Sequence, residues 1–171
     1  MVYYYDWAAM GMIHAVFGMT WFGMVVAAQV LMGPILRKST KLVELPPLGA
    51  IGPKIAPVGL AAGALTIITG FLFMLMKFGV DPGGWPANPE ARVVLVALVV
   101  AIISLSIGLL ILKPLAEEMG RNRPATPPPP EAEIPPPVKE KLSKMERWLN
   151  VQTILMVTMV AMMVLAIEGG V

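Results

Sequence analysis

Four long apolar runs dominate this sequence and restrict the folds that are open to it. A transmembrane helix needs about 20 largely apolar residues to cross roughly 30 Å of hydrocarbon. Four stretches meet that requirement, at about 7–36, 55–76, 93–112 and 148–167. Strands of a membrane barrel would appear as segments of about 10 residues with alternating polarity, which these continuous runs do not resemble. We therefore predict an all-α protein, a four-transmembrane-helix antiparallel bundle that forms a single membrane domain over 1–171.

Composition supports the lipid bilayer as the chief partner of this chain. Hydrophobic residues make up 57% of the sequence and charged residues 14%, whereas soluble domains have about 45–50% and 25%. The net charge of +2 comes from short loops beside apolar runs, which favours membrane topology over nucleic-acid binding. The absence of cysteine excludes disulfides and thiolate metal sites, and a single histidine excludes a histidine-rich metal cluster.

The positions of lysine and arginine predict the orientation. Basic residues concentrate in the connections at 37–54 and 113–147, whereas the connection between the second and third spans holds Asp81 and Glu90. Basic loops normally remain on the cytoplasmic side. We therefore expect both basic loops in the cytoplasm, both termini outside, and a location in the plasma membrane of a prokaryote.

The second basic loop contains a proline-rich segment, which we expect to form a cytoplasmic loop at 114–137. Its prolines between Pro124 and Pro137 predict an extended polyproline spacer, which serves either as a stiff linker or as a docking ligand. Apolar residues then recur at helical spacing over 138–147. This pattern predicts an amphipathic lead-in that lies at the interface or extends the fourth span.

Few residues at membrane depth could carry chemistry. No carboxylate or lysine lies centrally in any predicted span, which argues against proton relays, ion-coupled transport and acid–base catalysis. We therefore predict no catalytic residue and favour a role other than that of an enzyme. Serine and threonine in membrane helices mostly bond to their own backbone or to a neighbouring helix. The remaining polar residues include His14, Gln29 and Gln152.

His14 is the candidate ligand for a cofactor. Gly18 and Trp21 follow it at i+4 and i+7 on one helical face, and Gly11 precedes it by three residues. Small residues beside a histidine leave room for a flat porphyrin, and neutral imidazole is a common axial ligand of haem iron. Haem b bound by His14, Gly18 and Trp21 is one interpretation. The alternative is a histidine that bonds to a carbonyl or hydroxyl group on a neighbouring helix.

Methionine supplies a second candidate site. The chain has 14 methionines, including Met10 in the first span and Met159 and Met163 one turn apart in the fourth. Thioethers are soft ligands that select Cu(I), so His14, Met10, Met159 and Met163 form a candidate copper site. Methionine also fills irregular gaps between helices, and packing without any metal accounts for the same residues.

The first span contains a pattern with a family resemblance. It runs from Ile13-His14 through Trp21-Phe22-Gly23 to Gly33-Pro34. This pattern resembles the first helix of the copper resistance protein D (CopD)-like membrane superfamily, which includes the HemJ-type protoporphyrinogen oxidases. The resemblance implies a small helical bundle in which His14 binds haem or copper.

These observations leave several functions open. The first is a small accessory or binding subunit that packs with other membrane-protein subunits, or with copies of itself, in a larger membrane complex of the respiratory electron-transfer type. Such a subunit would hold a haem at His14 or no cofactor at all. The alternatives are a CopD-like copper-handling protein, a HemJ-like tetrapyrrole oxidase and, more distantly, a chlorophyll-binding protein.

Overall fold

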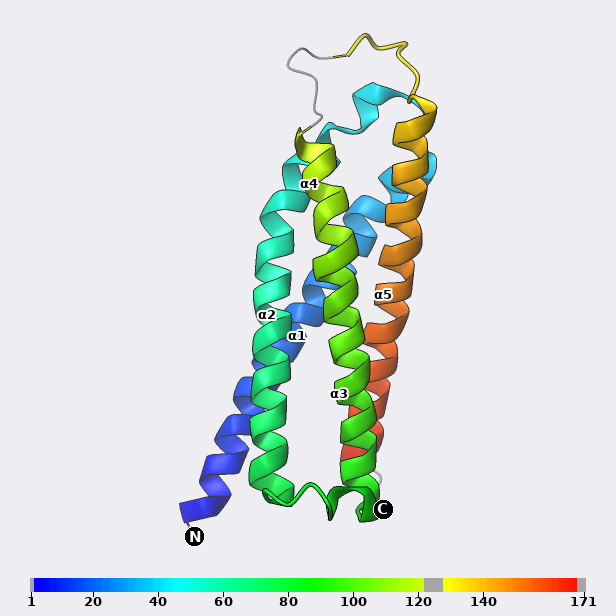
Figure 1. The fold of residues 1–171 in the computed structure, drawn as a ribbon. Helices are drawn as coiled ribbons and strands as arrows, with labels where there is room; N and C mark the ends of the chain where they lie inside the picture. The colour runs from blue at the N-terminus through cyan, green and yellow to red at the C-terminus, as the bar shows by residue number, and fades with distance from the viewer. Residues whose placement is uncertain (1, 122–127, 169–171) are drawn as a thin grey trace.

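The protein folds into four long helical rods, as the sequence predicts (Figure 1). The computed structural model describes residues 2–121 and 128–168, and the side chains of 2–7, 46, 47, 49, 51, 53 and 165–168 lie outside that description. The rods comprise α1 (Val2–Lys38), α2 (Pro46–Phe78), the continuous series α3 (Pro89–Ile107), η3 (Gly108–Leu112) and α4 (Lys113–Arg121), and α5 (Pro136–Glu168). Each rod is long and apolar enough to cross a membrane. The four-helix transmembrane bundle is therefore confirmed.

The helices run further than the predicted spans, and the proline-rich loop is correspondingly shorter. Residues 113–121, most of which we assigned to the loop at 114–137, are helical. The π-helix η3 explains this, because the N–H of Lys113 reaches back to the carbonyl of Gly108, and the wider turn accommodates the ring of Pro114. The predicted lead-in at 138–147 belongs to α5 and extends the fourth span. The first prolines of the segment, at 124–127, lie outside the described residues.

The end that carries both termini is closed by a short turn between α2 and α3. Gly79 ends α2 with a φ of 84°, a conformation that glycine adopts without a Cβ clash. The carbonyl of Gly79 accepts a hydrogen bond of 3.1 Å from the indole nitrogen of Trp85. Asn88 caps α3, since its side chain accepts from the N–H groups of Glu90 and Ala91.

The opposite end, which we call the basic end, holds residues 37–54, 113–121 and 128–147 (Figure 1). Residues 128–135 are tied to the connection after α1, since Leu42 donates to the carbonyl of Ala132 at 2.9 Å and Ile134 donates to that of Thr40 at 3.1 Å. A buried apolar cluster lies beneath this contact and joins all four rods. It consists of Met32, Leu36, Leu48, Leu115, Ala116, Leu142, Met145 and Leu149.

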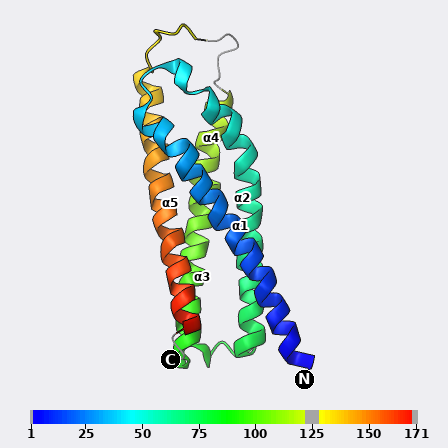
Figure 2. The same ribbon diagram turned by 180° about the vertical axis from the view of Figure 1, so that it is seen from behind.

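Helix α1 crosses the bundle obliquely. At the basic end it lies beside α5, and towards its N-terminus it lies beside α2 and away from α5 (Figures 1 and 2). A second buried cluster fills the bundle where α1 still meets α5, and it includes Trp21, Val25, Ala101, Met156 and Met159. Upstream of this cluster α1 diverges from α5 (Figure 2), and one flank of α1 has no neighbouring helix within the part of the chain that the structure describes.

Candidate functional site

His14 bonds to the neighbouring helix α2. Its Nδ1 lies 3.0 Å from the backbone carbonyl of Thr66, and the hydroxyl of Thr69 lies 3.4 Å from the same nitrogen. A carbonyl only accepts, so Nδ1 carries the proton and the neutral ring presents Nε2 as an acceptor. The imidazole reaches the carbonyl oxygen of Thr66 because residue 70 is a glycine, which allows the ring to lie close to the backbone of α2. Its position matches the alternative that we considered, a histidine bonded to a neighbouring helix.

Helices α1 and α2 make the same kind of contact twice, a large ring of α1 against a glycine of α2, in one antiparallel register. A Cβ at Gly70 would lie 2.7 Å from the imidazole of His14, and a Cβ at Gly63 would lie 2.8 Å from the indole of Trp21. Residues 14 and 21 are two helical turns apart, as are residues 63 and 70, so each large ring of α1 faces a glycine of α2. Small residues allow membrane helices to approach in this way.

Two glycines of α1 lie against side chains of α2. A Cβ at Gly11 would meet the ring of Phe73 at 3.3 Å, and one at Gly18 would meet Thr66 at 3.7 Å. We expected these positions to leave room for a porphyrin. Side chains of α2 instead lie next to them, so Gly11 and Gly18 are packing positions against α2 within this chain.

The four candidate copper ligands lie in different parts of the bundle. Met159 is buried in the cluster around Trp21 and Met163 packs against it, whereas neither His14 nor Met10 belongs to this cluster. Met10 lies near the N-terminal end of α1 (Val2–Lys38), and this end of the helix diverges from α5 (Figure 2). Among the described residues, no group of three or more His, Cys, Asp or Glu side chains could hold a metal.

A half-buried amide pair links α1 to α5. The side chain of Gln29 donates a hydrogen bond of 2.8 Å to Asn150, while the other amide atom of Gln29, Oε1, is buried without a partner among the described residues. The sequence analysis considered Gln29 and overlooked Asn150, which stands just inside the predicted fourth span. The sequence does indicate such a contact, because an asparagine between apolar residues at a span boundary needs a polar partner.

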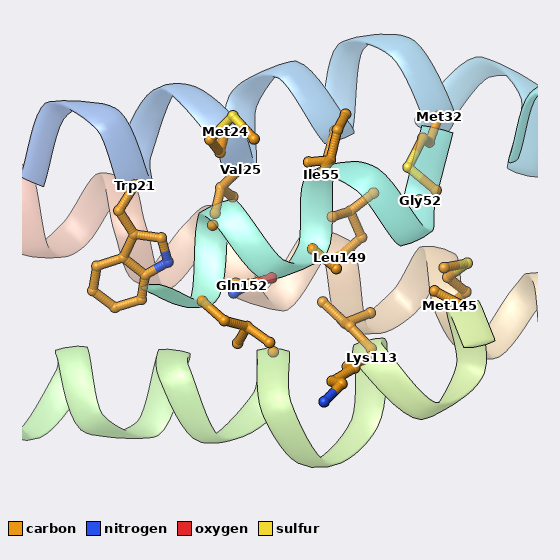
Figure 3. Close-up of a pocket in the computed structure, with 17 residues that line it drawn as sticks. Trp21, Met24, Val25, Met32, Gly52, Ile55, Lys113, Met145, Leu149 and Gln152 are labelled. Carbon is orange, nitrogen blue, oxygen red and sulfur yellow. The ribbon is translucent and has the colours of Figure 1, made fainter. Parts of the chain in front are cut away.

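A cavity of about 100 Å³ lies between the four rods on the basic-end side of Trp21 (Figure 3). Its wall includes glycines from two rods, Gly52 and Gly59 of α2 and Gly108 at the start of η3. The amide of Gln152 also lines it and donates a 3.3 Å hydrogen bond to the carbonyl of Ser104. The other lining residues are Trp21, Met24, Val25, Ala28, Met32, Ile55, Ala56, Leu60, Leu112, Lys113, Ala116, Met145 and Leu149.

The cavity includes one of the predicted cofactor residues and excludes the others. Trp21 lines it, but His14 and Gly18 do not. Its volume is well below the roughly 300–1,000 Å³ of typical ligand pockets, so it does not accommodate a porphyrin. The sequence analysis missed this cavity because it is formed by glycines on separate helices, whose convergence depends on the register of the bundle.

Carboxylates at the basic end are held in their charged form. The pKa of Glu118 is lowered by its 2.5 Å hydrogen bond to Lys141 and by the charge of that lysine. The pKa of Glu44 is lowered by hydrogen bonds from the backbone N–H groups of Thr40 and Lys41. Lys41 also pairs with Glu131 at 3.3 Å. These contacts connect the loops of the basic end to one another and to the helix ends.

Comparison with known proteins adds no relative. No protein family, no curated protein and no solved structure matches the chain.

Proposed function

We propose that this chain is a small accessory subunit of a larger membrane complex and not an enzyme. The observation that carries the proposal is the unpaired flank of α1. Upstream of Trp21, the contacts of α1 described above all go to α2, and α5 lies away from this segment (Figure 2). The exposed side chains there include Met12 and Met19, each 67% exposed, and Val16, 57% exposed. A helix of another subunit would complete this side of the bundle.

The use of the polar groups agrees with such a role. His14 bonds to α2 and Gln29 bonds to α5, while the hydroxyls of Thr20, Thr66 and Thr153 donate to carbonyls of their own helices. Catalysis would require groups that converge on a substrate. His14 and Gln29 instead join helices to one another, and the threonine hydroxyls are bonded within their own helices, which is the use expected in a structural subunit.

The size of the extracted particle tests the assembly. In a mild detergent, we expect the chain to migrate with other membrane proteins in a particle much larger than its own 18.3 kDa. Met19→Trp would enlarge a side chain on the open flank and release the chain from that particle. Leu110→Trp is the matched control, because Leu110 is 70% exposed on η3. A small particle for the unmodified chain, or equal behaviour of the two variants, would contradict the proposal.

We further propose that the basic end faces the cytoplasm. The excess of lysine and arginine in its two connections supports this orientation. A single cysteine introduced at Ser143 should react with a membrane-impermeant maleimide only after the membrane is opened, whereas one at Gly83 should react in intact cells without a cell wall. The reverse pattern would place the termini in the cytoplasm.

Haem at His14 is a second candidate function, favoured by one observation. The Nδ1–H of His14 donates to the carbonyl of Thr66, an arrangement that commonly orients metal-binding histidines and that leaves Nε2 free to bind iron. Because α2 covers the flanking glycines, a partner subunit would have to supply the rest of the cradle. The second axial ligand would be a methionine, a histidine of another subunit, or absent.

An absorption spectrum of the gently extracted complex tests the haem. A Soret band that disappears in His14→Ala while the complex stays assembled would support ligation. A spectrum without that band, from an intact complex, would leave His14 with its packing role alone. Gly23→Ala is the control, because a Cβ at Gly23 meets nothing within 4 Å.

A further inference from the structure

Hydrogen-bond donors line an otherwise apolar cavity. The side chain of Trp21 is 2% exposed, and its indole N–H has no hydrogen-bond partner among the described residues. Figure 3 shows the indole nitrogen on the side of the ring that faces the cavity. The amide of Gln152, 6% exposed, uses one N–H for the carbonyl of Ser104 and has a second N–H to offer. An acceptor in the cavity would give both N–H groups a hydrogen-bond partner.

The charges and polar groups of the lining residues indicate which kind of ligand the cavity favours. Lys113 is the one charged residue in the wall, and its ammonium group lies 3.8 Å from Glu117 outside the lining. No aspartate or glutamate is among the lining residues, all of which the structure describes. A cavity with N–H donors and no carboxylate in its wall favours a ligand with oxygen acceptors over an amine or another cation.

The size of the cavity restricts the part of the ligand that is buried. Its volume of about 100 Å³ is of the order of the roughly 150 Å³ apolar cavity in which benzene binds. The cavity is half-open, which allows a longer substituent to leave it. The π-helix η3 contributes Gly108 and Leu112 to the wall, and such π segments are frequent at functional sites.

We propose that this cavity binds a membrane-soluble ring compound with carbonyl groups, of the quinone class. The ring lies between the four rods, one carbonyl oxygen accepts from Trp21 and Gln152, and the apolar tail extends through the opening. This inference concerns binding alone and does not depend on the assembly proposed above.

Partition into lipid nanodiscs that contain the protein, relative to empty nanodiscs, tests the proposal. The probe is a decyl-substituted benzoquinone, and decylbenzene is the matched probe, with the same tail on a planar six-membered ring that carries no carbonyl groups. We expect saturable binding of the quinone at one molecule per chain and binding of decylbenzene that is weaker by about tenfold, the factor that corresponds to about 1.4 kcal/mol. Equal retention of the two probes, or no saturable binding of the quinone, would overturn the proposal.

Two kinds of variant locate the site. Trp21→Phe and Gln152→Met each remove an N–H group while retaining most of the side-chain volume, and each should weaken quinone binding several-fold. Ala56→Phe fills the cavity and should abolish binding, whereas Ala61→Phe is the control on the same helix, because Ala61 is exposed and does not line the cavity. Helicity and gel filtration identify the variants that fold. If Trp21→Phe, Gln152→Met and Ala56→Phe fold and bind the quinone as the unmodified chain does, the location is wrong. Loss of binding in folded Ala61→Phe would contradict it as well.

Discussion

The imidazole of His14 occupies the space in which a side chain at residue 70 would begin. A Cβ on Gly70 would lie 2.7 Å from Cε1 of His14, closer than two carbon atoms pack at their optimal separation of about 3.5–4.0 Å. The hydrogen bond from His14 to Thr66 requires this approach, because both contacts lie on the same face of α2. The hydrogen bond of His14 to Thr66 therefore requires a glycine at residue 70.

Gly70→Ala and Gly63→Ala should both destabilise the bundle. The added methyl group would have to displace the ring of His14 or Trp21, and overpacking of this kind typically costs about 1–3 kcal/mol. Steric trapping in bicelles would measure the free energy of unfolding. Gly23→Ala is the control on α1, and we expect it to be neutral or stabilising by up to about 1 kcal/mol, because alanine is favoured over glycine within a helix. A loss in the control equal to that at Gly70 would show that the close contacts are not the cause.

Gln29 and Asn150 should show strong coupling in a double-mutant cycle. Asn150→Leu removes the partner of a half-buried amide, and hydrogen bonds between membrane helices contribute about 0.6 kcal/mol on average and up to about 1.7 kcal/mol. Gln29→Met combined with Asn150→Leu removes both polar groups and should restore most of the lost stability. The cycle is measured by the same unfolding assay. Additive losses in the double variant would mean that the two amides do not interact in the membrane.

Glu118 should make the basic end sensitive to acid. Its pKa is lowered in the folded protein, chiefly by Lys141, so its contribution to stability is complete above the ordinary carboxyl pKa of 4.5 and is lost as pH falls through the lowered folded pKa. Glu118→Gln should remove that part of the acid dependence of the melting temperature. Glu117→Gln serves as the control, since Glu117 lies 3.8 Å from Lys113. Identical pH profiles for the unmodified chain and Glu118→Gln would contradict the prediction.

The sequence determined the architecture because length and apolar content are sufficient to recognise a membrane span. The same argument could not locate the helix ends at the basic end. There, Leu115 and Leu142 are buried in a core that joins the rods beyond the predicted spans. Such a core depends on tertiary contacts, so hydropathy predicted a loop where α4 forms.

The interpretation of His14 depended on information that a single helix does not contain. The spacing of Gly11, His14 and Gly18 indicates one face of α1, but it does not say which side chains of α2 lie opposite. In the structure, Phe73 and Thr66 occupy the positions next to the two glycines. A small residue on a helix therefore indicates that another group packs closely against it. Whether that group is a second helix or a cofactor depends on the register between the helices.

Photo-crosslinking in native membranes tests the central claim that α1 contacts another subunit. A photoreactive amino acid at Met19 lies on the open flank of α1, and the same group at Leu110 lies on exposed η3. We expect one discrete protein adduct from position 19, with the same partner recovered each time, and lipid adducts from position 110. Lipid adducts alone at position 19, in membranes where the complex is intact, would contradict it.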